Sequence, residues 1–366
     1  MLSPTPFPVS RFKIRESAID LKQSESSFEN VGSYEAEDFV PKRHYKPKWV
    51  APTLRELKKR KDAEIEKNHG EKIFHRSTFL EWNYDAEIFA FSNRLGEKFD
   101  DQLLRSALTH KSYIQREMSR LKDMGIDPDS IQLKENDELA TKGEELIERF
   151  VKGYLRAVFT RAPEEMIRAL HGYLTSTQVV VEVAKHIGVG DLMLCADFPC
   201  EPATYKKTFK ALVAALEQSS GEEKARIFVQ DLLVTMLYGQ DVNEIWNPID
   251  PVGILARILK RESRGEPEFR LIRQAGPNTI LASYHVAVYS DKNFVAEGTG
   301  ESIETAQEMA ARDALKRFFS TEDSMRALPF GRQLKKIQEK ITQLEFNPNI
   351  ALNEWTSYNV SSLAQS

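Results

Sequence analysis

The most constraining feature of the sequence lies in its last third, where the period of the hydrophobic residues changes twice. PVGILARILKRE, residues 251–262, places Leu255, Ile258 and Leu259 on one face of a helix. EFRLIRQ, SYHVAVYS and NFVAEGT then alternate as half-buried strands do, with a tight DKN turn between the last two. ETAQEMAARDALKRFF returns to the helical period. This α-β-β-β-α order predicts a small antiparallel sheet covered by two helices.

The region before this segment, residues 81–245, has a helical period throughout. WNYDAEIFAFSNRLGEKF places Ile88, Phe91 and Leu95 on one face, and MIRALHGYLTSTQVVVEVAKHIG and TFKALVAALEQSSGEEKARIFVQDLLVTML are similarly periodic. SSG is typical of a helix end, and the EE pair that follows suits the first turn of the next helix. We therefore predict an α+β protein, an all-helical domain followed by the α-β-β-β-α domain.

Composition divides the chain into four parts. Residues 1–80 are polar and rich in Ser, Pro and charge, so we interpret them as an N-terminal extension that includes a basic linker. The helical domain spans residues 81–245 and the α-β-β-β-α domain spans residues 248–320. Residues 321–366 form a basic, helical and finally irregular tail.

The charge of the chain is nearly balanced. A net charge of −4 over 366 residues argues against a protein that coats nucleic acid with its whole surface. The clearest basic cluster is residues 42–62, where cations interleave with Tyr45 and Trp49. It is either a charged linker leading into a solvated helix or an arm that orders on RNA, with aromatic rings stacking on bases. Its adjacent cations are Lys58, Lys59, Arg60 and Lys61.

Three weaker signals bear on the compartment. Arg11, Lys13 and Arg15 precede the first acid, which hints at an organelle-targeting peptide. Cys195 and Cys200 have no His or Cys neighbours at zinc spacing, so we expect two reduced thiols. No apolar run approaches the roughly 20 residues that span a bilayer, so we expect no membrane insertion.

One acidic stretch raises the question of catalysis. NDELATKGEEL, residues 136–146, holds several carboxylates within a few helical turns. Such a cluster either binds a divalent metal ion for chemistry or begins a solvated helix, where acids are favoured by the helix dipole. The residues that surround it in the fold decide between the two interpretations.

Three motifs resemble those of ribonuclease III domains. LLRSALTHKSY, residues 103–113, is similar to an early helix motif of that family. Residues 136–144 follow the family's signature of asparagine, then acid-Arg-Leu-Glu-Phe-Leu-Gly-Asp. KTFKALVAA, residues 207–215, resembles the family's Asp-x-Phe-Glu-Ala-Leu-Ile-Gly-Ala motif, and a Ser-Gly turn follows it. Order and spacing match in all three.

The departures from the family matter for function. In active members, clustered carboxylates hold Mg²⁺, which generates hydroxide and stabilises charge on the phosphate. The corresponding positions here are Ala140, Glu144, Lys207 and Lys210. Both lysines would repel a divalent ion and could pair with Glu144 instead. We therefore predict no metal, no cofactor and no catalytic residue, and we expect His110 to pack a helix rather than act as a base.

The α-β-β-β-α segment resembles a double-stranded-RNA-binding domain. Such domains touch minor grooves with the first helix and the first inter-strand loop, and phosphates with the closing helix. The closing helix normally starts with Ser-Lys-Lys-x-Ala-Lys, whereas residues 302–307 read SIETAQ, so ordinary duplex binding should be weak. The remaining candidate RNA contacts are Arg257, Lys260, Arg261, Asn278 and Thr279. A solvated basic helix face is the alternative interpretation of the first three.

With these departures, the chain resembles the family of mitochondrial large-subunit ribosomal protein forty-four. WVAPTLRELKKRKD, NTILASYHVAVY and EEKARIFVQDLL carry this resemblance, which covers about residues 47–320. It implies a structural constituent of the mitochondrial large ribosomal subunit, located in the matrix, that contacts ribosomal RNA and other mitochondrial ribosomal proteins. A second ribonuclease III-like subunit is among the implied partners. Two alternatives stay open, a free RNA-binding adaptor that dimerises through the nuclease-like fold and an active double-stranded-RNA endonuclease.

Overall fold

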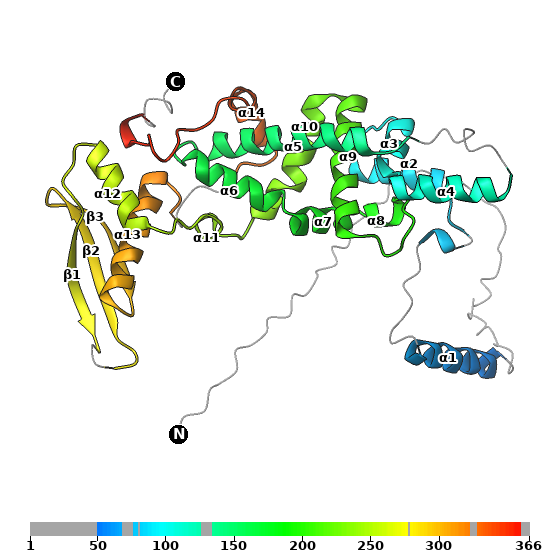
Figure 1. Ribbon diagram of the computed structural model, residues 1–366, viewed down its shortest axis with the longest axis horizontal. Helices are drawn as coiled ribbons and strands as arrows, with labels where there is room; N and C mark the ends of the chain where they lie inside the picture. Colours follow the sequence, from blue (N-terminus) through cyan, green and yellow to red (C-terminus); the bar gives the residue numbers. More distant parts are fainter. Residues whose placement is uncertain are drawn as a thin grey trace, which may run out of the picture. The chain divides into compact units, whose positions relative to one another are not determined.

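The computed structural model describes residues 50–67, 76–79, 81–125, 134–276, 279–322 and 328–359. Chain contacts divide the protein into two compact units, residues 1–72 and residues 73–366. The described part of the first unit is helix α1 (Val50–Lys67), on which residues 52–63 are exposed. The second unit contains the other labelled elements of Figure 1. None of the helices within the described ranges is long and apolar enough to cross a bilayer.

The first part of the second unit is the predicted all-helical domain. Its elements are η1 (Arg76–Thr78), α2 (Tyr84–Leu95), α3 (Asp101–Leu108), α4 (Lys111–Asp123), α5 (Asp137–Val158), α6 (Glu164–Leu174), α7 (Thr177–His186), α8 (Val189–Leu192), α9 (Pro202–Ser220), α10 (Glu222–Leu232), η3 (Val234–Leu237) and α11 (Val242–Ile245). Ile88 and Phe91 are buried, as the periodicity predicts, and Gly221 separates α9 from α10. Helices α5 and α9 pack against each other at the centre, because each carries a row of fully buried side chains such as Phe150 and Phe209.

The predicted α-β-β-β-α domain follows. Its elements are α12 (Pro251–Arg261), β1 (Glu268–Ala275), β2 (Ser283–Ser290), β3 (Asn293–Gly300) and α13 (Ile303–Phe319). The sheet is antiparallel in the order β1-β2-β3, and Figure 1 shows α12 and α13 on one side of it. Asp291 and Lys292 have φ angles of 51° and 67°, as a two-residue hairpin turn of right-handed twist requires. Leu255, Val288 and Ala310 form its core, so the fold is confirmed.

Residues 328–359 of the C-terminal tail are part of the folded structure rather than an appendage. Helix α14 (Arg332–Leu344) packs on α5 and buries Ile341 in the core of the helical domain. Further on, Trp355 is fully buried, and its ring lies 5.1 Å from that of Phe319 in the α-β-β-β-α domain. Its indole Nε1–H donates to the carbonyl oxygen of Arg161 in the helical domain at 2.8 Å. The tail therefore joins both domains.

Buried ion pairs hold this tail in place. The Glu345 carboxylate, just after α14, lies 2.6 Å from Nε of Arg226 and 3.4 Å from Nε of Arg149. Arg156 forms a second buried pair with Glu164 at 2.6 Å and also donates to the carbonyl oxygen of Glu345 at 2.9 Å. Buried charges need partners, so these contacts tie the tail to α5, α6 and α10.

Candidate functional site

The four positions that the sequence motifs predict to match the metal ligands of ribonuclease III domains meet around one pocket. Ala140 and Glu144 on α5 and Lys207 and Lys210 on α9 line a pocket of about 340 Å³. Gly143 makes this meeting possible, because a Cβ added there would lie 1.8 Å from the carbonyl oxygen of Lys210. The two helices therefore cross in backbone contact at the pocket.

Two ion pairs occupy the two carboxylates that line the pocket. The ammonium group of Lys210 lies 2.8 Å from Oε1 of Glu144, the pair that the sequence suggests. Lys207 instead pairs with Asp137, at the start of α5, and this hydrogen bond lowers the pKa of the Asp137 carboxyl. Asp137 and Glu144 are seven residues apart and share one face of α5, so this face offers an acid to each of the two lysines.

The donor set of this pocket does not fit a divalent metal ion. Among the residues that the structure describes, no group of three His, Cys, Asp or Glu side chains could hold one. A third lysine, Lys206, also lines the pocket, and burial together with Lys210 lowers its pKa. Nearby Glu148 pairs with Lys152, which lowers the pKa of that carboxyl. Three ammonium groups therefore line this pocket, whereas a divalent ion needs carboxylate oxygens.

His110 beside the pocket caps a helix. Its Nδ1 accepts from the backbone N–H of Ser112 at 3.3 Å and lies 2.8 Å from the Ser112 hydroxyl, at the N-terminus of α4. Burial lowers the pKa of His110, and the charge of Lys207 lowers it further. A neutral ring can accept these hydrogen bonds, which is the structural role expected from the sequence.

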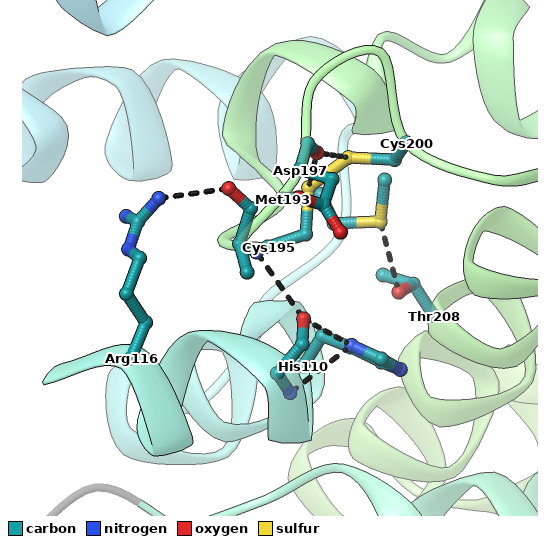
Figure 2. The surroundings of a disulfide bond; sticks show 9 residues. His110, Arg116, Met193, Cys195, Asp197, Cys200 and Thr208 are labelled. Carbon is teal, nitrogen blue, oxygen red and sulfur yellow. Dashed lines mark hydrogen bonds between the residues drawn. A yellow bond between two sulfur atoms is a disulfide. The ribbon is translucent and has the colours of Figure 1, made fainter. Parts of the chain in front are cut away.

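The expectation of two reduced thiols is wrong in this structure. Cys195 and Cys200 form a disulfide with an S–S distance of 2.01 Å, because the loop between them turns back and brings their Cα atoms to 6.8 Å (Figure 2). The loop is also fixed to α4, since Arg116 donates to the carbonyl oxygen of Ala196 at 2.8 Å and the Ala196 N–H donates to Ser112 at 3.2 Å. The signal in the sequence is the short separation of five residues, which a local turn can close.

The candidate RNA contacts on α12 have different surroundings. Arg257 and Lys260 are exposed. Arg261, in contrast, donates through Nη1 to the carbonyl oxygens of Leu352 and Trp355 at 2.9 and 2.8 Å, and burial lowers its pKa. Arg261 thus holds the tail, and any contact of it with RNA stays a prediction.

The other candidate contacts are Asn278 and Thr279, between β1 and β2 in the sequence, and the cations of α1. Thr279 donates its hydroxyl to the carbonyl oxygen of Gly276 at 2.8 Å, whereas Asn278 lies outside the described residues. Helix α13 begins with a capping box of Ser302 and Thr305, and the charged side chain in its first turn is Glu304. On α1 the four candidate cations are exposed, namely Lys58, Lys59, Arg60 and Lys61.

Comparison with known proteins places this architecture in a family. Residues 83–216 match the description "Large ribosomal subunit protein mL44, endonuclease domain", and residues 246–356 match "MRPL44 dsRNA-binding domain". The large ribosomal subunit protein mL44 of Caenorhabditis elegans is 31% identical over 290 residues, which are 78% of this chain and 72% of that protein. The chain belongs to the mL44 family. The resemblance found in the sequence is thereby confirmed.

More distant relatives of this mL44 family member are nucleases. Ribonuclease 3 of a Nitratiruptor species is 24% identical over 237 residues, which are 63% of this chain and 96% of that enzyme. The nuclease domain of ribonuclease III from Campylobacter jejuni is 21% identical over 41% of this chain and 96% of that structure, with a TM-score of 0.34. The mL44 RNA-binding match extends to residue 356, so it includes α14 and Trp355.

Proposed function

We propose that this chain is a structural constituent of the mitochondrial large ribosomal subunit, where it binds ribosomal RNA and neighbouring proteins and supports translation. Membership of the mL44 family supports the ribosomal assignment. One observation supports a scaffold rather than an enzyme, namely that Lys207 and Lys210 hold their ammonium groups against Asp137 and Glu144 in the nuclease-like pocket. These ion pairs connect α5 to α9 across the pocket.

The electrostatics of the pocket explain why it should not cleave RNA. A metal-dependent nuclease needs several carboxylates to bind Mg²⁺ and to lower the pKa of its bound water. Here each of the two carboxylates already has a cation within contact distance, and Ala140 supplies no oxygen ligand. A divalent ion would have to break both ion pairs. The two ammonium groups would remain near the ion and repel it.

The first prediction is that the purified chain leaves long duplex RNA intact in Mg²⁺ or Mn²⁺. Changing Lys207 to Asp alone should not create activity, because one added acid does not complete a metal site. Gel analysis of labelled duplex measures both, with an active ribonuclease III as the positive control. Metal-dependent cleavage that disappears in Glu144→Ala contradicts this part of the proposal.

Patches of cations provide the proposed anchoring on RNA. Helix α1 exposes four consecutive cations, residues 58–61, and α12 exposes Arg257 and Lys260. Phosphate contacts of this kind fix position and orientation on folded RNA without reading bases. The rest of the chain carries more acids than cations, which suits contacts with other proteins better than contacts with RNA phosphates.

The second prediction tests the assignment itself. On a gradient of mitochondrial extract at moderate salt, the chain should migrate with the large subunit in near-equal ratio to other subunit proteins. Changing Lys58, Lys59, Arg60 and Lys61 to Glu should move it toward the free fractions, because phosphate contacts are lost and repulsion is gained. A variant with Lys and Arg exchanged at these positions keeps the charge and should migrate as the wild type. A wild-type chain found mostly free supports a free adaptor instead.

The third prediction concerns the start of α13. Changing Ile303 and Glu304 to Lys in the full chain should tighten binding to generic duplex RNA and steepen its salt dependence by about one to two phosphates. The full chain is needed because Trp355 packs into this domain from the tail. Anisotropy titrations at several salt concentrations measure the slope. The Ile303→Gln, Glu304→Gln variant separates gained attraction from lost repulsion, and tight, steeply salt-dependent binding by the wild type contradicts the prediction.

A further inference from the structure

A groove lies along the last strand of the α-β-β-β-α domain, away from the nuclease-like pocket. It has a volume of about 480 Å³ and is bounded by β3, by α13 and by the segment that contains α11. Trp246, Met309 and Phe319 give it an apolar lining, and Met309 is 44% exposed. The lining of this groove shares no residue with the nuclease-like pocket or with the candidate RNA contacts.

The edge of β3 in this groove presents backbone groups without a strand partner. Within the described residues, β3 pairs with β2 on one side only. The Glu297 N–H points away from β2, since it lies 3.4 Å from Oδ2 of Asp313 on α13. Backbone groups alternate in direction along an antiparallel strand, so the N–H and C=O of Thr299 also point outward. Glu297, Gly298 and Thr299 all line the groove.

The charge of the groove selects its occupant. Its lining contains the carboxylates of Asp241, Glu244, Glu297 and Asp313 and the cations of Arg312 and Lys316, a net charge of −2. RNA phosphates would be repelled by this excess of acids. A second copy of the chain would bring the same carboxylates face to face, so it is disfavoured for the same reason. A basic polypeptide is the complementary partner.

We propose that the groove binds an extended, basic segment of a neighbouring protein, which adds a fourth strand to the sheet at β3. Its backbone pairs with the outward N–H and C=O of Thr299, as in other cases of strand addition. One of its apolar side chains lies against Trp246 and Met309, while its cations approach Glu244 and Glu297. This inference rests on the proposed function for the identity of the partner, a protein of the large ribosomal subunit.

Photocrosslinking in the assembled particle tests the proposal. Met309 is replaced by p-benzoylphenylalanine, and crosslinked peptides from purified large subunits are identified by mass spectrometry. We expect a crosslink to a basic segment of one neighbouring protein. A crosslink to RNA, to a second copy of this chain or to an acidic segment overturns the proposal, as does the absence of any crosslink.

Substitution of Thr299 separates strand addition from simple proximity. Thr299→Pro removes the outward N–H and leaves the ladder to β2 intact, which an edge strand tolerates. It should lower the crosslink yield about three- to tenfold, the effect of one lost hydrogen bond. Thr299→Ala keeps the N–H and should lower the yield less than about twofold. Equal yields from both variants overturn the strand-addition geometry.

A charge variant tests the proposal without altering the backbone of β3, so its result does not depend on whether the Thr299→Pro variant folds. Glu244 is exposed, so Glu244→Lys should leave the fold unchanged and lower the crosslink yield about threefold or more. An unchanged yield overturns the basic character of the partner. The gradient distinguishes this failure from failure of the proposed function, because a chain that runs with the large subunit but crosslinks elsewhere overturns the inference alone.

Discussion

Glu345→Ala is expected to lower the free energy of unfolding by about 3–5 kcal/mol, the range found when one partner of a buried ion pair is removed. The Glu345 side chain is 1% exposed, and Arg226, 2.6 Å from it, is 7% exposed. The substitution leaves the Arg226 charge buried without its main partner and also removes the contact with Arg149. Urea denaturation followed by tryptophan fluorescence measures the change.

Two companion variants make this prediction specific. Glu339 is an exposed acid of α14, so Glu339→Ala should change the free energy of unfolding by less than about 0.5 kcal/mol. The double variant Glu345→Leu, Arg226→Met replaces the pair by apolar side chains and should recover much of the loss. If Glu345→Ala were as mild as Glu339→Ala, the buried network would not hold the tail.

The second large effect is expected at Gly143, where α5 crosses α9. Gly143→Ala should lower the free energy of unfolding by about 2–4 kcal/mol, because the new Cβ would lie 1.8 Å from the backbone oxygen of Lys210. The helices would have to separate, which would loosen the core packing between them and change the geometry of the nuclease-like pocket. Thermal and urea unfolding measure the loss.

A matched glycine should respond in the opposite direction. Gly172 lies in α6 with open space where its Cβ would be. Gly172→Ala should therefore raise the free energy of unfolding by about 0.5–1 kcal/mol, because alanine restricts the unfolded chain and favours the helix. Similar losses at both positions would mean that glycine flexibility, rather than the helix crossing, matters at Gly143.

Features that depend on local pattern could be predicted from the sequence. Leu255, Ile258 and Leu259 share one helical face in the sequence, and all are fully buried. The three alternating segments are strands, and DKN forms the hairpin turn, because period and turn residues act over a few positions. The four pocket positions, in contrast, follow only from the resemblance to ribonuclease III motifs, because period and turn residues do not place α5 beside α9.

Features that depend on distant partners could not be predicted. Arg261 has the sequence context of an RNA contact, yet its partners are carbonyl oxygens of the tail, nearly a hundred residues away. Glu345 and Trp355 stand in a polar, irregular stretch, and only the folded domains supply their cavities. The periodicity of a segment does not encode which distant surface completes its burial.

Residues 328–359 have a consequence for the thermodynamics of assembly. By tying the helical domain to the α-β-β-β-α domain, the tail restricts their rotational freedom when the chain folds, before any partner is met. If a flexible tether joined the two domains, their rotational entropy would be lost only on binding. Attachment through both domains at once would then be weaker. Once one domain has docked, the other is held at a high effective concentration near its own site. Individually weak contacts can then add up to stable incorporation.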